Sequence, residues 1–486
     1  MFGKKDTSKK AGGVFKMGLG IFVLITLASL MSIRSFPTMG LVQWQLIAFS
    51  ILAIVMYLIP ASLISAELAT GWPKTGGVYI WVREAFGKRW GFTAVWLQWF
   101  QMTIGFIGIL TFIAATVSYV IDSSLANDKL FQFFMVVVVW WGMTIVNFKG
   151  LKTYARVNSL FVSIGVLIPG AILIIGGIWW VMSGHTTLIT LNPTLNDFIP
   201  NFANIDTLVL LVTFIFIFIG IEMTSVHAKE IKNVGKNYPL GLLMVGLIMT
   251  GISILGALVI SMMVPVGSLN LLGGIMQSYQ IIFGAGIAVT ILALMITIGS
   301  IGEVSAWILG PVRGLLVTAQ DGNLPTILQK ENKNGMPVNM MILQAILITF
   351  WGGIYVILPG GVNSSYWMLF ALATLVYIVM YFLMYAAAIK LRYSHPEVKR
   401  AFTVPGGKIG MWLLAGWGFA SMAFLFILAL VPPSQITSLN LSTPEYILLM
   451  LFGIVVITIV PLVIYHFKKP SWTPEKGSQG EKEAQE

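Results

Sequence analysis

The sequence contains no cysteine, and charged residues make up only 10% of its 486 positions. The lack of cysteine excludes a disulfide framework, a thiolate metal site and a cysteine nucleophile. Soluble domains carry charge at roughly 25% of their positions, and a chain that is 57% hydrophobic could not cover a soluble surface with polar atoms. Soluble enzymes and disordered chains are therefore excluded, and the composition predicts a polytopic membrane protein.

Several motifs of soluble chemistry are also missing. The chain has no GxxxxGK[ST] loop to hold nucleotide phosphates, which argues against a nucleotide-driven pump. Its four histidines are not spaced like metal ligands, so we expect neither a metal site nor a bound cofactor. We also predict no catalytic residues and no enzymatic activity.

Long apolar runs are what the sequence has in abundance. A helix needs ~20 mainly apolar residues to cross the hydrocarbon core of a bilayer, and we find twelve such stretches. They predict an all-α membrane protein with twelve transmembrane helices in one domain. The stretches lie at about 17–40, 45–69, 91–121, 131–148, 157–182, 207–227, 239–264, 284–312, 339–358, 366–389, 411–431 and 445–467.

The positively charged residues gather on one side of the predicted membrane. An even number of spans puts both chain ends on the same side, and that side receives 27 of the 29 lysines and arginines. Lys129 falls on the other side, and Arg34 lies inside the first span. The positive-inside rule then predicts a multi-pass protein of the bacterial cell (inner) membrane with both termini in the cytoplasm. Anionic lipid explains the net charge of +11 without a nucleic-acid partner.

Two spans carry polar interruptions near their middle. The first contains Arg34 and Pro37 within the run 32–37, and the sixth contains Gly220 followed by Glu222. Proline removes a backbone donor from a helix, and an arginine at this depth costs ~2.5–3.5 kcal/mol on insertion scales. Such interruptions are often simple kinks, but their pairing in spans one and six is typical of inverted repeats that each begin with a broken helix.

The domain organisation follows from this pairing. We expect a cytoplasmic segment at 1–16 and a single twelve-helix domain at 17–467, followed by a polar, disordered cytoplasmic tail at 468–486. Within the domain we expect repeat one at about 17–182, repeat two at about 207–389 and extra helices at about 411–467. Broken helices have a use, because their free N–H groups hold a carboxylate and their unwound carbonyls take an ammonium group. An α-amino acid therefore fits between the two breaks.

Four acids lie within or beside the spans, namely Glu67, Glu222, Glu303 and, at an inner end, Glu230. Glu222 follows the sixth break, and Glu303 lies in an apolar stretch of the eighth span, where burial favours the neutral acid unless a cation pairs with it. Glu303 is therefore either a proton carrier or the partner of a cation, with Arg34 as one possible mate. Glu67, at the inner end of span two, is expected to form an interfacial ion pair with Lys74 or Arg83.

Two tyrosines in the tenth span complete the set of candidates. Tyr377 and Tyr381 are four residues apart, so their hydroxyls fall on one helix face, where they line a substrate path or form a packed pair. Pro37, Glu67 and Trp307 are expected to act in structure or gating. The expected substrate-binding residues are Ile33, Arg34, Ser35, Phe36, Gly220, Ile221, Glu222, Tyr377 and Tyr381, with Glu303 and Glu222 in proton coupling or ion pairing.

Five strings of the sequence resemble the amino acid–polyamine–organocation (APC) transporter superfamily. The nearer resemblance is to the glutamate/GABA antiporter family, through 86–92, TAQDGNLP, NKNGMPV and KRAFTVPGGK. The likeness runs over nearly the whole chain, in order. The strings are AELATGWPKTGGVYIWV (66–82), GIEMTSVHAKEIKNVGKNYP (220–239), GPVRGLLVTAQDGNLP (310–325), NKNGMP (332–337) and HPEVKRAFTVPGGK (395–408).

The resemblance implies a LeuT-type fold with five-plus-five inverted repeats and two extra helices. It implies alternating access around a central site formed by spans one, six, eight and ten. By position, Ile33–Pro37 and Gly220–Glu222 are then the unwound segments, Glu303 the acid of span eight, and Tyr377 and Tyr381 the tyrosines near the substrate path. The chain departs from the enteric exchangers at Arg34-Ser35, where those have a tyrosine–glutamate pair, and its 468–486 segment is too short for their C-terminal plug.

We therefore expect an antiporter that exchanges one α-amino acid for another amino acid or its decarboxylated amine. Arg34 would favour an acidic side chain, which puts glutamate and GABA first. The alternatives are an exchanger of neutral or aromatic amino acids of the tyrosine/tyramine type, and a proton-coupled symporter with Glu303 or Glu222 as carrier. A transporter-like sensor or partner subunit of a single-span protein is the third. The expected partners are amino acids or amines and the lipid bilayer, with no oligomeric state predicted.

Overall fold

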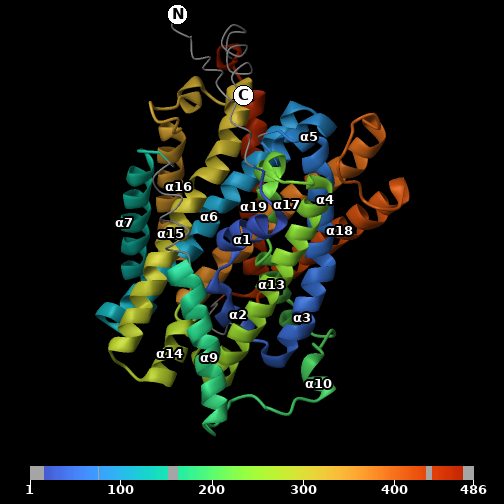
Figure 1. Cartoon of the computed structure of the whole chain (residues 1–486). Helices are drawn as coiled ribbons and strands as arrows, with labels where there is room; N and C mark the ends of the chain where they lie inside the picture. The colour runs from blue at the N-terminus through green and yellow to red at the C-terminus, as the bar shows by residue number, and fades with distance from the viewer. Residues whose placement is uncertain (1–15, 75, 151–162, 434–440, 474–486) are drawn as a thin grey trace, which may run out of the picture.

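The computed structural model describes residues 16–74, 76–150, 163–433 and 441–473. These residues form helices and connecting turns, with one isolated bridge between Met17 and Ile231 and no strand among them (Figure 1). Most of the predicted cytoplasmic segment, 1–15, and the end of the predicted tail, 474–486, lie outside the described residues. The all-α prediction is confirmed.

Ten of the described helical segments are long and apolar enough to cross a membrane, and a bent pair makes an eleventh. The bent pair is α1 (Leu19–Leu30) with the segment Ile33–Gly40. The ten are Gln43–Gly71 (η2 Gln43–Gln45, α3 Leu46–Ala53, η3 Ile54–Leu58 and α4 Ile59–Gly71), α6 Lys88–Ile121, α7 Lys129–Asn147, Ile164–Met182 (η5 Ser163–Leu167 and α9 Ile168–Met182), α13 Val234–Met263, Ile287–Asn323 (α15 Ile287–Thr318 and η8 Ala319–Asn323), α16 Val338–Ile357, α17 Val362–Ser394, α18 Gly407–Ala429 and α19 Thr443–His466.

The remaining expected span, which is the sixth along the chain, has no described helix long enough to cross a membrane. Its helix α12 (Leu211–Phe216) ends after 6 residues, and the chain turns through 217–220 before the 3-10 helix η6 (Ile221–Glu230). The described residues thus contain ten long spans and one bent pair, and a broken apolar segment lies at the place predicted for the sixth span. The remaining short elements are α5 Val78–Phe86, η4 Ser123–Asn127, α10 Leu195–Phe198, α11 Ile205–Leu208, η7 Val266–Ser268, α14 Gly274–Phe283, η9 Thr326–Gln329 and η10 Pro470–Trp472.

The break in span one lies two residues earlier than expected. Met31 and Ser32 are extended, η1 (Ile33–Ser35) is a single 3-10 turn, and α2 (Phe36–Gly40) continues at an angle of 49° to α1. The prediction that Ile33–Pro37 are unwound is therefore wrong at its C-terminal part. Pro37 sits in the first turn of α2, where its missing N–H leaves no helical hydrogen bond unmade and its fixed φ suits the helix.

The break in span six is at Gly220, as predicted. Gly220 has φ +96, a conformation that favours glycine. A Cβ built on it would lie 3.3 Å from Cη2 of Trp307, so both the backbone and the space call for glycine here. Glu222 lies just beyond the break, in the first turn of η6.

The long helices pack around α6, α15 and α17. Of the ten spans, α17 and α6 are the most buried, and α19 and α7 are the least buried. We therefore place α17 and α6 in the core of the helix bundle and α19 and α7 at its periphery. The loop that carries α10 lies with α14 at the end of the molecule opposite α5 (Figure 1). We call the end with α10 and α14 the opposite face, and the end with α5 the terminal face.

Both described chain ends lie on the terminal face. The Met17 amide donates to the Glu230 carbonyl at 2.6 Å, and the Gln329 side-chain amide donates to the Trp472 carbonyl at 2.8 Å. Residues 468–473, which the sequence assigns to a disordered tail, thus include the ordered turn η10 against the loop after η8. The even number of spans is consistent with this shared face, which is where the sequence places its lysines and arginines.

Candidate functional site

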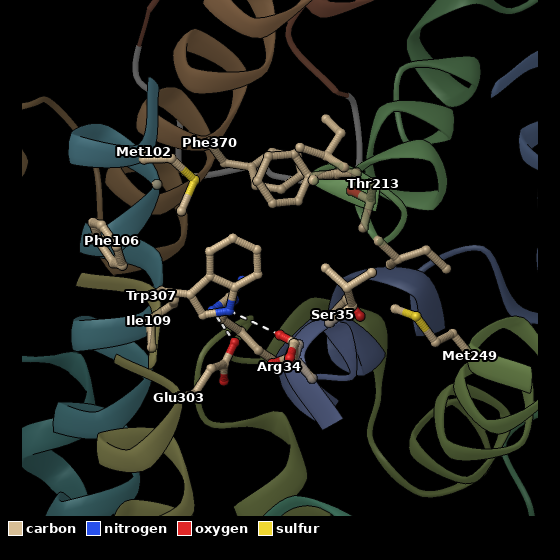
Figure 2. Close-up of a pocket in the computed structure, with 18 of the residues that line it drawn as sticks. Arg34, Ser35, Met102, Phe106, Ile109, Thr213, Met249, Glu303, Trp307 and Phe370 are labelled. Atoms are coloured by element: carbon tan, nitrogen blue, oxygen red, sulfur yellow. Dashed lines mark hydrogen bonds and ion pairs between the residues drawn. The ribbon is translucent and has the colours of Figure 1, made fainter. Parts of the chain in front are cut away.

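A central cavity of about 100 Å³ lies between the two broken spans (Figure 2). The breaks at Ser32 and Gly220 create this space, because the backbone changes direction there and no regular helix fills it with side chains. The walls come from spans one, three, six, seven, eight and ten. Its lining includes Ser29, Leu30, Ser32, Arg34, Ser35, Gln101, Met102, Gly105, Phe106, Ile109, Thr213, Phe216, Gly220, Met249, Ser253, Glu303, Trp307, Tyr366 and Phe370.

Arg34 and Glu303 lie next to each other in the wall of this cavity (Figure 2). Nη1 of Arg34 is 3.9 Å from Oε1 of Glu303, and the two side chains are 16% and 10% exposed. The structure brings together the pair that the sequence left as one possibility for Glu303, at a distance beyond a hydrogen bond. Nη1 of Arg34 is buried with no hydrogen-bond partner. The cation and the acid are thus neighbours whose hydrogen-bonding capacity is not used up by each other.

Trp307 separates the central cavity from a second one. Its indole Nε1 donates to the Ser29 carbonyl at 2.9 Å, which ties α15 to the last turn of α1. Trp307, Leu30 and Gly220 line both cavities. A side chain at Gly220 would lie in close contact with this indole. The glycine therefore allows the Trp307 ring to pack closely against the backbone of span six.

The second cavity, of about 340 Å³, lies on the terminal-face side of Trp307. We call it the inner cavity. Ile25, 42% exposed, and the exposed Arg313 lie on its wall, so it opens to solvent at that end. Phe216 and Phe370 also line the central cavity, and the centroids of their rings lie 4.4 Å apart. In the described conformation Trp307 therefore stands between the central cavity and an inner cavity that opens at the terminal face.

Glu222 borders the inner cavity and is fully buried. The hydroxyl of Tyr377 donates to its Oε1 and that of Tyr381 to its Oε2, while Nε2 of Gln98 donates to Oε1 at 3.0 Å. Tyr57 shares a hydrogen bond with Tyr381. Three neutral donors saturate this carboxylate, so the cluster locks span six to spans three and ten.

Several expected substrate-binding residues do not reach the central cavity. Tyr377 and Tyr381 do share one helix face, as predicted, but that face meets Glu222. Ile33 and Phe36 are buried in packing, with Phe36 against Gly256. Ile221 is buried as well and lines neither cavity. In the first break, Arg34 and Ser35 line the central cavity, while Ile33 and Phe36 on either side of them are packed against protein.

Glu67 forms an ion pair, but the predicted partners are wrong. Instead of Lys74 or Arg83, its carboxylate accepts from Nε of Arg392 at 2.6 Å and from a second Arg392 nitrogen. Nε of Arg400 lies 3.4 Å away, and the Val404 amide donates to Glu67 at 2.7 Å. Glu67 thus anchors the loop between α17 and α18, at the terminal face and away from both cavities.

Sequence reasoning missed the neutral polar residues of the site. Gln98, Gln101 and Thr213 lie in apolar stretches without a charge or proline nearby that would mark them. Two glutamines spaced i, i+3 inside one span were the available signal, because amide side chains are uncommon in lipid-facing positions. The aromatic residues Phe216 and Phe370 carry no signal that separates them from ordinary packing.

The chain is similar to known proteins over most of its length. The family model described as amino acid permease matches residues 19–461. An uncharacterised transporter of Legionella pneumophila is 36% identical over 457 residues, which is 93% of this chain and 96% of that protein. A glutamate/gamma-aminobutyrate antiporter of Lactococcus lactis subsp. cremoris is 33% identical over 471 residues, 95% and 93% of the two chains.

A more distant relative carries a different substrate name. A probable agmatine/putrescine antiporter of Lactococcus lactis subsp. lactis is 25% identical over 361 residues, 73% of this chain and 75% of that protein. The family model and the closer relatives confirm the resemblance drawn from the sequence strings. With its helical membrane-spanning fold, this chain belongs to the amino acid permease family of multi-pass transporters, within the APC superfamily.

Proposed function

We propose that this protein is an antiporter that exchanges glutamate for GABA. The observation that carries the proposal is the loosely paired Arg34 and Glu303 in a cavity between two helix breaks. The names of the two relatives at 32% and 33% identity support the same substrate pair.

The charge pattern of the cavity suits a zwitterion. GABA carries one carboxylate and one ammonium group, and glutamate carries a second carboxylate in addition; Arg34 and Glu303 offer one partner each for a carboxylate and an ammonium group. Buried charges are costly without partners, so a carboxylate and an ammonium group that insert between Arg34 and Glu303 satisfy all four of these charges. The buried Nη1 of Arg34 is free to donate to a carboxylate, and a charge-assisted bond of this kind is stronger than a neutral one.

Transport follows by alternating access through the partition. In the described conformation substrate reaches the inner cavity from the terminal face, and Trp307 separates it from Arg34. Movement of Trp307 away from Ser29 would admit the substrate to the central cavity. Separation of Phe216 from Phe370 would then release it to the opposite face. We assign the terminal face to the cytoplasm of a bacterial cell (inner) membrane, because the lysines and arginines gather there.

Proton-coupled symport is the second candidate function. Glu222 favours it, because this carboxylate borders the inner cavity and forms no ion pair within the described part of the chain. A proton taken up there would need no amino acid on the other side of the membrane. We assign Glu222 first to positioning, because three hydrogen-bond donors from spans three and ten hold its carboxylate in place.

Counterflow in liposomes tests the proposal. Purified protein is reconstituted into vesicles loaded with GABA, glutamate, agmatine or no substrate, and uptake of labelled glutamate is followed with and without a proton gradient. We expect uptake to depend on internal glutamate or GABA and to be absent from empty or agmatine-loaded vesicles. Uptake into empty vesicles that is driven by the proton gradient would instead establish symport and overturn the exchange proposal.

A further inference from the structure

The central cavity contains buried polar atoms for which the described residues offer no hydrogen-bond partner. Nε2 of Gln101 and Oγ1 of Thr213 have no hydrogen-bond partner, and the same holds for Nη1 of Arg34. All three residues line this one cavity. Buried polar groups are nearly always hydrogen-bonded. Three unsatisfied polar atoms around one cavity therefore point to a ligand group that enters it.

Gln101 contrasts with its neighbour Gln98 on the same helix. The two are three residues apart on α6, and both are buried. The Gln98 amide donates to Glu222, whereas that of Gln101, 1% exposed, is left without an acceptor. Packing does not explain the second glutamine, because an apolar side chain of the same length would fill its place without an unsatisfied amide.

Thr213 shows the same contrast with other threonines of the long helices. Thr111 and Thr116 donate to carbonyls one turn back, which is the usual way to satisfy a threonine inside a helix. Thr213, 2% exposed, makes no such bond. It lies just before the break in span six, and Figure 2 shows it across the cavity from Phe106 and Ile109.

We propose that Gln101, Thr213 and the Nη1 atom of Arg34 form a subsite for the carboxylate of the substrate. The inference rests on the proposed function and names the determinants of its specificity. An amide N–H₂, a hydroxyl and a guanidinium N–H are donors, and an ionised carboxylate is an acceptor with room for several of them. An ammonium group finds no acceptor at the amide nitrogen and is repelled by Arg34, so it turns to Glu303. The subsite therefore selects amino acids over diamines that lack a carboxylate.

Paired analogues and matched variants test the subsite in reconstituted full-length protein. Labelled GABA exchange is inhibited with unlabelled GABA or with 4-aminobutanamide, which replaces the carboxylate by a neutral amide. The preference for the carboxylate is the inhibition constant of 4-aminobutanamide divided by that of GABA. We expect Gln101→Met and Thr213→Val each to lower this ratio about tenfold, as for loss of a hydrogen bond to a charged group. Thr213→Ser, which keeps the hydroxyl, should retain it.

Thr297→Val is the control, because Oγ1 of Thr297 is also buried and without a partner but does not line the central cavity. It should keep the wild-type ratio. Wild-type exchange together with an unchanged ratio in both Gln101→Met and Thr213→Val would overturn the subsite alone. Failure of the wild type to exchange glutamate or GABA would overturn the proposed function and the subsite with it. A ratio lowered equally in Thr297→Val would show a general packing effect and also overturn the subsite.

Discussion

Two buried acids lie on either side of the Trp307 partition and are used in opposite ways. Glu222 is held by three donors from spans three and ten. Glu303 faces a single cation at 3.9 Å, in a cavity where further polar atoms are unpaired. A saturated carboxylate has little capacity left for a ligand, whereas an under-used one keeps its capacity for a group that comes and goes.

The difference separates structure from recognition within one membrane core. Both acids are conspicuous in the sequence for the same reason, an acid within an apolar span, and nothing in the sequence ranks them. Only the partners do so. Removing each acid tests this division, and so does altering Arg34, the Trp307 partition or the entrance of the inner cavity.

Removing Glu222 should have the largest effect on stability. Glu222→Ala leaves Tyr377, Tyr381 and Gln98 without their acceptor, and each buried unsatisfied group costs about 1–3 kcal/mol. Glu303→Ala should cost only about 1 kcal/mol, because Arg34 borders a cavity that can hold water. Thermal unfolding of the two variants in detergent measures the order. Equal losses would contradict the division between the two acids.

Removing the Arg34 side chain should instead affect binding. Arg34→Ala takes away the cation for the substrate carboxylate, and truncating one partner of a buried charged contact costs about 2–5 kcal/mol. We expect the KM for glutamate to rise about a hundredfold with little change in thermal stability. Arg34→Lys, which keeps the charge but loses the planar fork, should fall between. An unchanged KM in Arg34→Ala would show that this arginine is structural.

The division also shows how far sequence reasoning reaches here. Helix positions were predictable because apolar runs of bilayer length have one stable solution, and Gly220 marked its break because no other residue suits φ +96. The first break was misplaced because Pro37 belongs to a first turn, not to the gap before it. Partners across the fold were harder to predict. The Arg34–Glu303 pair was inferred from scarcity of charge, but Arg392 lies 325 residues from Glu67 and no local pattern links them.

A side chain at the partition should slow exchange. Gly220→Ala requires a β-carbon at a positive φ, at a cost of about 1–3 kcal/mol, and that carbon would lie 3.3 Å from the Trp307 ring. We expect the maximal exchange rate to fall about tenfold while the KM for glutamate changes less than threefold. Gly251→Ala is the control, because its built Cβ meets nothing within 4 Å. A loss as large in that variant would argue against a specific role of the partition.

The smallest effect is expected at the entrance of the inner cavity. Arg313 is exposed on its wall, on the same helix as Trp307, so it raises the local concentration of anions without holding one in place. Arg313→Gln should raise the KM for glutamate added on the terminal face two- to threefold at low salt, and the difference should fade at high salt, where the charge is screened. The KM for GABA, which has no net charge, should stay the same. A salt-independent rise for both substrates would mean that Arg313 contacts the bound substrate, and recognition would then extend across the partition into the inner cavity.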